Sequence, residues 1–173
     1  MRNILKEMLC AAAIACLMLS VAAHAGGEKS KKGKGIKMRA DLSAAQETSV
    51  SPGFIESANI TAKFNSDLSA VTVKLKVKGG GSVGGAHFHC ARPGTDGPLP
   101  FGLFGPGPLT FDGAEASGTL TNADYTGADC TGFIGRPVTN IAALAFAMRD
   151  GLIYINVHTV ENPGGEVRGQ MLE

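Results

Sequence analysis

Residues 70–78 read Ala-Val-Thr-Val-Lys-Leu-Lys-Val-Lys, and this stretch carries the clearest structural signal in the chain. Val71, Val73 and Leu75 fall on one side of an extended backbone, whereas Thr72 and the three lysines fall on the other. Strict alternation over this length is typical of a β-strand with one face in a hydrophobic core and the other in water. The segment therefore predicts an antiparallel sheet with a solvated outer face.

The sequence around this strand predicts an all-β domain. Gly, Pro, Asn and Asp recur every ten or so positions, as they do between short strands. Further strands are expected at residues 54–64, 85–91, 152–160 and 166–172. We expect a Greek-key-like β-sandwich or a partly closed barrel.

Two segments break the strand pattern. Residues 92–108 are rich in Pro and Gly, which predicts a long irregular loop of the kind that often carries function. Residues 139–151 have apolar side chains at helical spacing, with Thr139 or Asn140 as the N-cap and Gly151 as the stop. The domain should therefore contain one short helix.

The glycine-rich segment at residues 78–84 matches two catalytic motifs by letter. It fits both a dinucleotide-binding fingerprint and the serine elbow of hydrolases. Both motifs need a helix directly after the glycines, because the helix N-terminus meets the phosphate or supports the serine. A strand is expected there instead, so the segment is interpreted as a turn between two strands.

The N-terminus has the pattern of a secretory leader. Arg2 and Lys6 precede an apolar run that ends in Ala23-His24-Ala25, a small-x-small cleavage site. The run is shorter than the roughly 18 residues that span a bilayer, so no membrane anchor is expected in the mature chain. We interpret residues 1–25 as a signal peptide and the protein as secreted or periplasmic.

Charge is unevenly distributed after the predicted cleavage site. Residues 28–39 hold six basic residues and one acidic residue, whereas the rest of the mature chain holds 8 basic and 13 acidic residues. Residues 26–37 are interpreted as a flexible basic tail, either a solubilising leader or a segment that binds an anionic surface. The acidic remainder, which lacks Trp, predicts no nucleic-acid partner.

Two cysteines remain in the mature chain. Cys90 and Cys130 are expected to form one disulfide in an oxidising compartment. The alternative is a thiolate metal ligand at Cys90, next to two histidines.

The three remaining histidines form a candidate metal site. His87 and His89 occupy alternate positions of a predicted strand, so both imidazoles point the same way, about 7 Å apart at Cα. His158 lies in another strand, on the face opposite its apolar residues. If the two strands are neighbours, three Nε2 atoms could meet at one ion, and a nitrogen site favours copper over zinc. The alternative is that the histidines are structural.

Four residues near the histidines are candidates for orienting them. Tyr154 and Asn156 share the face of His158, and Glu166 and Arg168 share one face of the final strand. No residue is assigned a catalytic role.

Residues 38–173 resemble the chordin-type (CHRD) domain. The resemblance is carried by DLSAAQET at 41–48, AHFH at 86–89 and YINVHTVENPGGEVRGQ at 154–170. It implies an all-β extracellular domain and gives little biochemistry.

A weaker similarity links two segments to the copper-binding strands of Cu,Zn superoxide dismutases. GAHFHC at 85–90 resembles their His-x-His strand, and INVH at 155–158 resembles a strand with a further copper ligand. The resemblance implies that His87, His89 and His158 are copper ligands. The bridging histidine and the other zinc-binding histidines have no counterpart, so a copper-only site is implied.

Three functions are compatible with these observations. The first is metal handling through one copper ion. The second is a protein-interaction module that binds an unknown protein partner without metal, and the third is a copper redox enzyme such as a dismutase.

Overall fold

A computed structural model describes residues 35–49 and 53–173. The predicted signal peptide, 1–25, and the predicted basic tail up to residue 34 lie outside the described residues. Lys37, which the sequence placed at the end of the tail, is the first residue of a strand. In the described ranges, no helix has the length and apolar character needed to cross a membrane.

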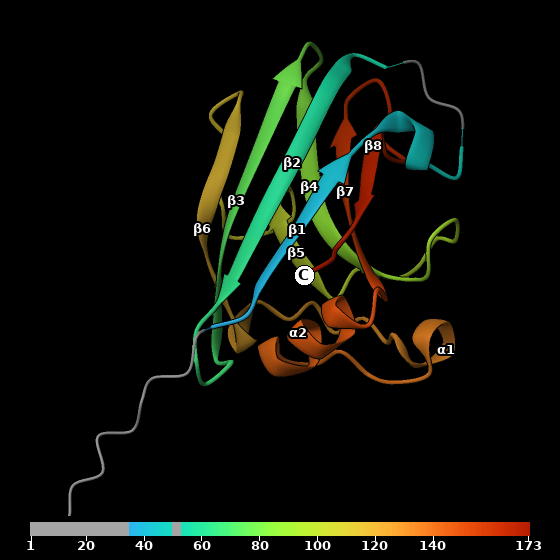
Figure 1. Cartoon of the computed structure of the whole chain (residues 1–173). Helices are drawn as coiled ribbons and strands as arrows, with labels where there is room; N and C mark the ends of the chain where they lie inside the picture. The colour runs from blue at the N-terminus through green and yellow to red at the C-terminus, as the bar shows by residue number, and fades with distance from the viewer. Residues whose placement is uncertain (1–34, 50–52) are drawn as a thin grey trace, which may run out of the picture. The chain divides into compact units, whose positions relative to one another are not determined.

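In the described residues, eight strands form two antiparallel sheets of four strands each (Figure 1). One sheet, called sheet A here, has the order β1 (Lys37–Leu42), β2 (Ile55–Phe64), β3 (Ala70–Gly79), β6 (Glu115–Thr121). The other, sheet B, has the order β5 (Phe101–Phe104), β4 (Val83–Cys90), β7 (Ile153–Thr159), β8 (Val167–Gln170). The expected β-sandwich is confirmed, and the described residues do not form a closed barrel.

The sheets join along one edge, where β1 lies beside β8. The backbones of Arg39 and Leu172 exchange hydrogen bonds in both directions, and Ser43 and Arg168 do the same. This edge fixes β8 against the segment that follows β1, and that segment includes a 3-10 helix at Ala44–Gln46.

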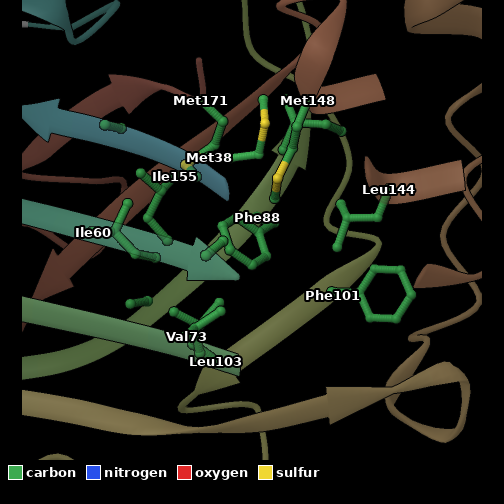
Figure 2. Close-up of a cluster of buried hydrophobic side chains, with 14 of the residues drawn as sticks. Met38, Ile60, Val73, Phe88, Phe101, Leu103, Leu144, Met148, Ile155 and Met171 are labelled. Atoms are coloured by element: carbon green, nitrogen blue, oxygen red, sulfur yellow. The ribbon is translucent and has the colours of Figure 1, made fainter. Parts of the chain in front are cut away.

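The hydrophobic core fills the space between the sheets. Figure 2 shows Ile60 and Val73 from sheet A beside Phe88 and Ile155 from sheet B. Residues 71, 73 and 75 of β3 are fully buried, as the alternation in residues 70–78 predicts. Burial of this apolar surface is the main favourable term in folding.

The predicted helix is present as α2 (Ile141–Arg149), which lies across one end of the sheets (Figure 1). The Asn140 side chain accepts a hydrogen bond from the Ala143 N–H, so Asn140 is the N-cap. Gly151 has a φ of 67°, which suits the residue after a helix end. A one-turn helix, α1 (Thr131–Ile134), and a second 3-10 helix, Asn122–Asp124, were not predicted.

The predicted irregular loop at 92–108 is partly wrong, because it contains β5. The sequence of β5, Phe-Gly-Leu-Phe, is too short to show the alternation of a strand, and prolines and glycines surround it. It nevertheless pairs with β4. β1 and β6 were also not predicted as separate strands. The glycine-rich segment is followed by β4, so it is a turn between β3 and β4, as expected.

Cys90 and Cys130 form the expected disulfide, which ties the end of β4 to the residue before α1. The Cys90 side chain is fully buried on the core side of sheet B. The alternative of a thiolate metal ligand at Cys90 is therefore wrong.

Candidate metal centre

The three histidines meet on the outer face of sheet B because β4 and β7 are antiparallel neighbours. His87 lies opposite Asn156, His89 lies opposite Tyr154, and His158 lies opposite Gly85. His158 is therefore diagonal to His87 on the same face, at a spacing that long and aromatic side chains can bridge. The strand adjacency that the site requires is present.

The imidazole rings converge. The ring centroids of His87 and His158 are 4.7 Å apart, and His89 lies 5.8 Å from His87 and 6.0 Å from His158. One nitrogen from each ring can be chosen so that all three lie within 4.8 Å of one another. Because a metal–imidazole bond is about 2.0 Å long, two nitrogens on one ion are at most about 4 Å apart, so the rings would move together by up to about 1 Å to bind it.

Backbone carbonyls select which nitrogen of each ring is free. A carbonyl only accepts, so the nitrogen that contacts it must carry the proton. His89 Nδ1 donates to Gly97 O at 2.9 Å, and His158 Nδ1 donates to Pro163 O at 3.0 Å. In both rings the lone pair is then on Nε2, as expected from the sequence.

His87 differs from the other two histidines. Its Nε2 donates to the Gly105 carbonyl at 3.0 Å, so its lone pair is on Nδ1. The expectation that all three rings would use Nε2 is therefore wrong for His87. The sequence held no signal for this, because the Gly105 carbonyl comes from the segment after β5.

The free nitrogens of two rings are buried without a partner. Within the described part of the chain, neither His89 Nε2 nor His158 Nε2 has a hydrogen-bond partner, although both are shielded from solvent. Leaving a buried polar atom unsatisfied costs about 1–3 kcal/mol. Two such atoms facing one cluster are what a metal site without its ion would contain.

Burial also keeps the cluster neutral. Desolvation lowers the pKa of both His87 and His89 to about 4, although the hydrogen bonds to backbone carbonyls act to raise it. Desolvation also lowers the pKa of His158. The rings are therefore unprotonated at neutral pH, and each offers a lone pair without first releasing a proton.

Two glycines make room for the His87 ring. A Cβ on Gly85 would lie 2.7 Å from Gly105 O and 3.0 Å from His87 Nε2. Gly105 has a φ of 51°, and its Cβ would lie 2.1 Å from Gly84 O. The carbonyl that orients His87 can approach only because both positions lack a side chain.

Tyr154 and Arg168 support His89 from the side. The Tyr154 ring stacks on the His89 ring, with centroids 4.9 Å apart, and the Arg168 guanidinium lies 3.5 Å over the Tyr154 ring centroid. Arg168 also donates to the carbonyls of Arg92 and Thr95 and pairs with Asp96 at 3.2 Å. It thereby holds the segment whose Gly97 carbonyl orients His89.

Asn156 and Glu166, the other two candidates for orienting the histidines, make different contacts from those of Tyr154 and Arg168. Asn156 lies opposite His87, yet its Nδ2 donates to Glu47. Glu166 is fully buried and accepts from the Phe54 and Ile55 N–H groups and from two side chains, Thr159 and Asn162. It fixes the turn that presents the Pro163 carbonyl, so its effect on His158 is indirect.

Sequence reasoning missed the groups that orient the rings. The carbonyls of Gly97, Gly105 and Pro163 belong to loops, and any residue has a carbonyl, so no residue type marks them. Glu47 was also missed. Burial raises its pKa to about 7, against the opposing effect of the Arg168 charge.

The cluster has the chemistry of an all-nitrogen metal site. It presents three neutral imidazoles, and no carboxylate belongs to the group of converging side chains in the described residues. Such donors suit copper, zinc and other borderline ions, whereas magnesium and calcium prefer oxygen.

A family model of the CHRD domain matches residues 38–171. No curated protein and no solved structure matches the chain. The weaker similarity to superoxide dismutase strands therefore stays a prediction from the sequence.

Proposed function

This chain belongs to the CHRD-domain family, and we propose that it is an exported member that binds one copper ion through His87, His89 and His158 and acts in metal handling. The observation that carries the proposal is the pair of buried, unpartnered Nε2 atoms beside a third imidazole. Coordination would satisfy both atoms at once.

The donor set supports copper over zinc. For a given set of nitrogen ligands, divalent copper binds more tightly than zinc. The three rings come with their tautomers already selected by carbonyl hydrogen bonds, and such outer partners tune ligand basicity and orientation. Each ring therefore has one nitrogen with a free lone pair before any ion binds.

Burial of the cluster favours holding an ion over turning over a substrate. The two unpartnered nitrogens are shielded from solvent, and His87 is only 7% exposed. A redox enzyme such as a dismutase would need its substrate to reach an open ligand position. When bound, copper would supply high affinity for nitrogen ligands and one-electron redox chemistry, and the protein residues would orient the rings and exclude water.

Export is part of the proposal. The disulfide suits an oxidising compartment, and CHRD domains occur in extracellular proteins. The pattern of residues 1–25 is that of a signal peptide. A secreted or periplasmic location accounts for all three observations.

Metal analysis of the purified protein tests the proposal. After incubation with equimolar copper and zinc and removal of unbound metal, we expect about one copper per chain, and the triple variant His87→Ala/His89→Ala/His158→Ala should retain none. Gln170→Ala is the control, because the Gln170 side chain donates two hydrogen bonds to the carbonyls of Ala91 and Gly151 and is not one of the proposed ligands.

Two results would overturn the proposal. One is equal copper content in the wild type and the triple variant. The other is a wild type without copper whose triple variant is merely less stable. Either would make the histidines structural and leave the domain as a protein-interaction module.

A further inference from the structure

The outer face of sheet A concentrates positive charge on a domain that is otherwise acidic. Ten basic residues lie in residues 37–173, and six of them project from this face. They are Lys37, Arg39, Lys63, Lys74, Lys76 and Lys78. The same face carries only Asp41, Glu56 and Glu115 as acids.

Four of these cations have no acidic partner among the described residues. Lys74 pairs with Glu115 and Lys78 pairs with Glu56. The cations without an ion pair are Lys37, Arg39, Lys63 and Lys76, and the first three lie on β1 and β2. Lys37 and Lys63 lie directly opposite each other on β1 and β2. Like charges in directly opposite positions destabilise a sheet, so this arrangement costs stability.

The electrostatics of Lys37 reflect the same crowding. The charges of Arg39 and Lys63, together with slight desolvation, lower the pKa of Lys37, and Arg39 has the largest effect. A patch of this kind attracts anions.

A shallow hollow lies within the charged patch. It has a volume of about 330 Å³ and is framed by Lys37, Lys63 and Lys74. The hydroxyl groups of Thr61, Thr72 and Ser117 line it between the cations. The volume is at the lower end of the roughly 300–1,000 Å³ typical of ligand sites. Ammonium groups that alternate with hydroxyls match the carboxylates or sulfates and the hydroxyls of a charged sugar.

The face lacks the features that lipid or nucleic-acid partners need. The exposed large hydrophobic side chains of the described residues are Phe54, Phe133, Phe146, Val160 and Leu172, and none belongs to β1, β2, β3 or β6. Binding to a membrane surface gains from apolar side chains that insert, and single-stranded nucleic acids stack on aromatic rings. A flat, hydrophilic and cationic face fits a hydrated, linear polyanion.

We propose that the outer face of sheet A binds acidic polysaccharide, with Lys37, Arg39 and Lys63 contacting its carboxylate or sulfate groups. This face is on the opposite side of the sandwich from the histidine cluster, so the proposal does not depend on metal binding. An exported protein with this face would be retained at an acidic polysaccharide matrix.

Affinity chromatography on immobilised polygalacturonate tests the proposal. We expect the protein to be retained at low salt and released as the salt rises, because salt screens exposed charges. The variant Lys37→Gln/Arg39→Gln/Lys63→Gln should bind about tenfold more weakly. The matched control Arg92→Gln/Arg136→Gln/Arg149→Gln removes the same charge from other surfaces and should bind like the wild type.

Several outcomes would overturn the proposal. Equal weakening in both triple variants would mean that only net charge matters. Full loss of binding in Lys31→Gln/Lys32→Gln/Lys34→Gln, with the face variant unaffected, would assign binding to the preceding basic segment. Equal affinity for double-stranded DNA of matched charge would remove the assignment to polysaccharide. Circular dichroism should show that every variant is folded, and copper content should be unchanged in all of them.

Discussion

The two outer faces of the sandwich differ in what covers them. On β3 of sheet A, buried and exposed residues alternate, so the lysines stay in water. On β7 of sheet B, six of seven residues are buried. The hydrophobic core covers the inner face of this strand, and loop residues cover its outer face. The same architecture thus provides one solvated cationic face and one desolvated histidine face. Coverage by loops, and not the strands themselves, sets their chemistry.

Removing Arg168 should have the largest effect on stability, because Arg168 holds the loop that covers the outer face of sheet B. Arg168→Ala removes the guanidinium donor from the Thr95 carbonyl and one of the donors from the Arg92 carbonyl, and it opens a cavity beside Tyr154. We expect a loss of about 3 kcal/mol in the free energy of unfolding. Urea denaturation measures it.

Lys74→Gln is the comparison substitution on the solvated outer face of sheet A. Lys74 forms an exposed ion pair, so its loss should change the free energy of unfolding by no more than about 0.5 kcal/mol. Similar losses for Arg168→Ala and Lys74→Gln would show that coverage does not distinguish the two faces.

A methyl group at Gly85 should disturb the histidine face locally. Gly85→Ala places a Cβ against Gly105 O and the His87 ring, so we expect a loss of about 1–3 kcal/mol in stability and weaker copper binding. Gly84→Ala is the control, because its Cβ would meet only His158 O at 4.0 Å. If Gly84→Ala and Gly85→Ala bind copper equally well, the His87–Gly105 contact does not matter for the site.

The low pKa values of the histidines predict a pH-insensitive site. A histidine of ordinary pKa loses about eightfold in metal affinity between pH 7 and 5.5, because protons compete for the lone pair. His87 and His89 titrate near 4, and burial lowers the pKa of His158 as well, so copper affinity should fall by less than the eightfold of one ordinary histidine over this range. Isothermal titration at several pH values measures this, and a steep fall below pH 6.5 would contradict it.

The same shifts affect the stability of the metal-free protein. Between pH 6.5 and about 4 the unfolded chain binds more protons at these histidines than the folded chain does. Their contribution is therefore fully present above pH 6.5 and is lost as the pH falls through the folded-state pKa. Glu47 acts in the opposite direction, since its pKa is raised, so Glu47→Gln should make the acid loss steeper.

The smallest expected effect is a change in melting temperature from single substitutions on the outer face of sheet A. Lys63→Gln removes the repulsion with Lys37 and should raise the melting temperature by about 1 °C at low salt. Lys76→Gln should lower it slightly, because Lys76 lies opposite Glu115. Both shifts should vanish at high salt. Shifts of the same sign for Lys63→Gln and Lys76→Gln would show that cross-strand charge has no role.

Much of the fold was predictable because its signals are local. Alternation in residues 70–78 identified β3 and its core face, and helical spacing identified α2 with Asn140 as its cap. β5 was missed because four residues among prolines carry no period, and its pairing with β4 is a tertiary contact.

For the candidate site too, the local patterns were predictable and the tertiary contacts were not. Local pattern alone indicated that His87 and His89 share a face, since side chains alternate along any strand, and it favoured Cys130 as the partner of Cys90. No local pattern indicated that β4 and β7 are neighbours, which brings His158 to the pair. The packing of distant loops also sets which ring nitrogens are free, because those loops supply the carbonyls that bind the other nitrogens. Long-range register and loop position depend on how the whole chain packs, and no local pattern encodes them.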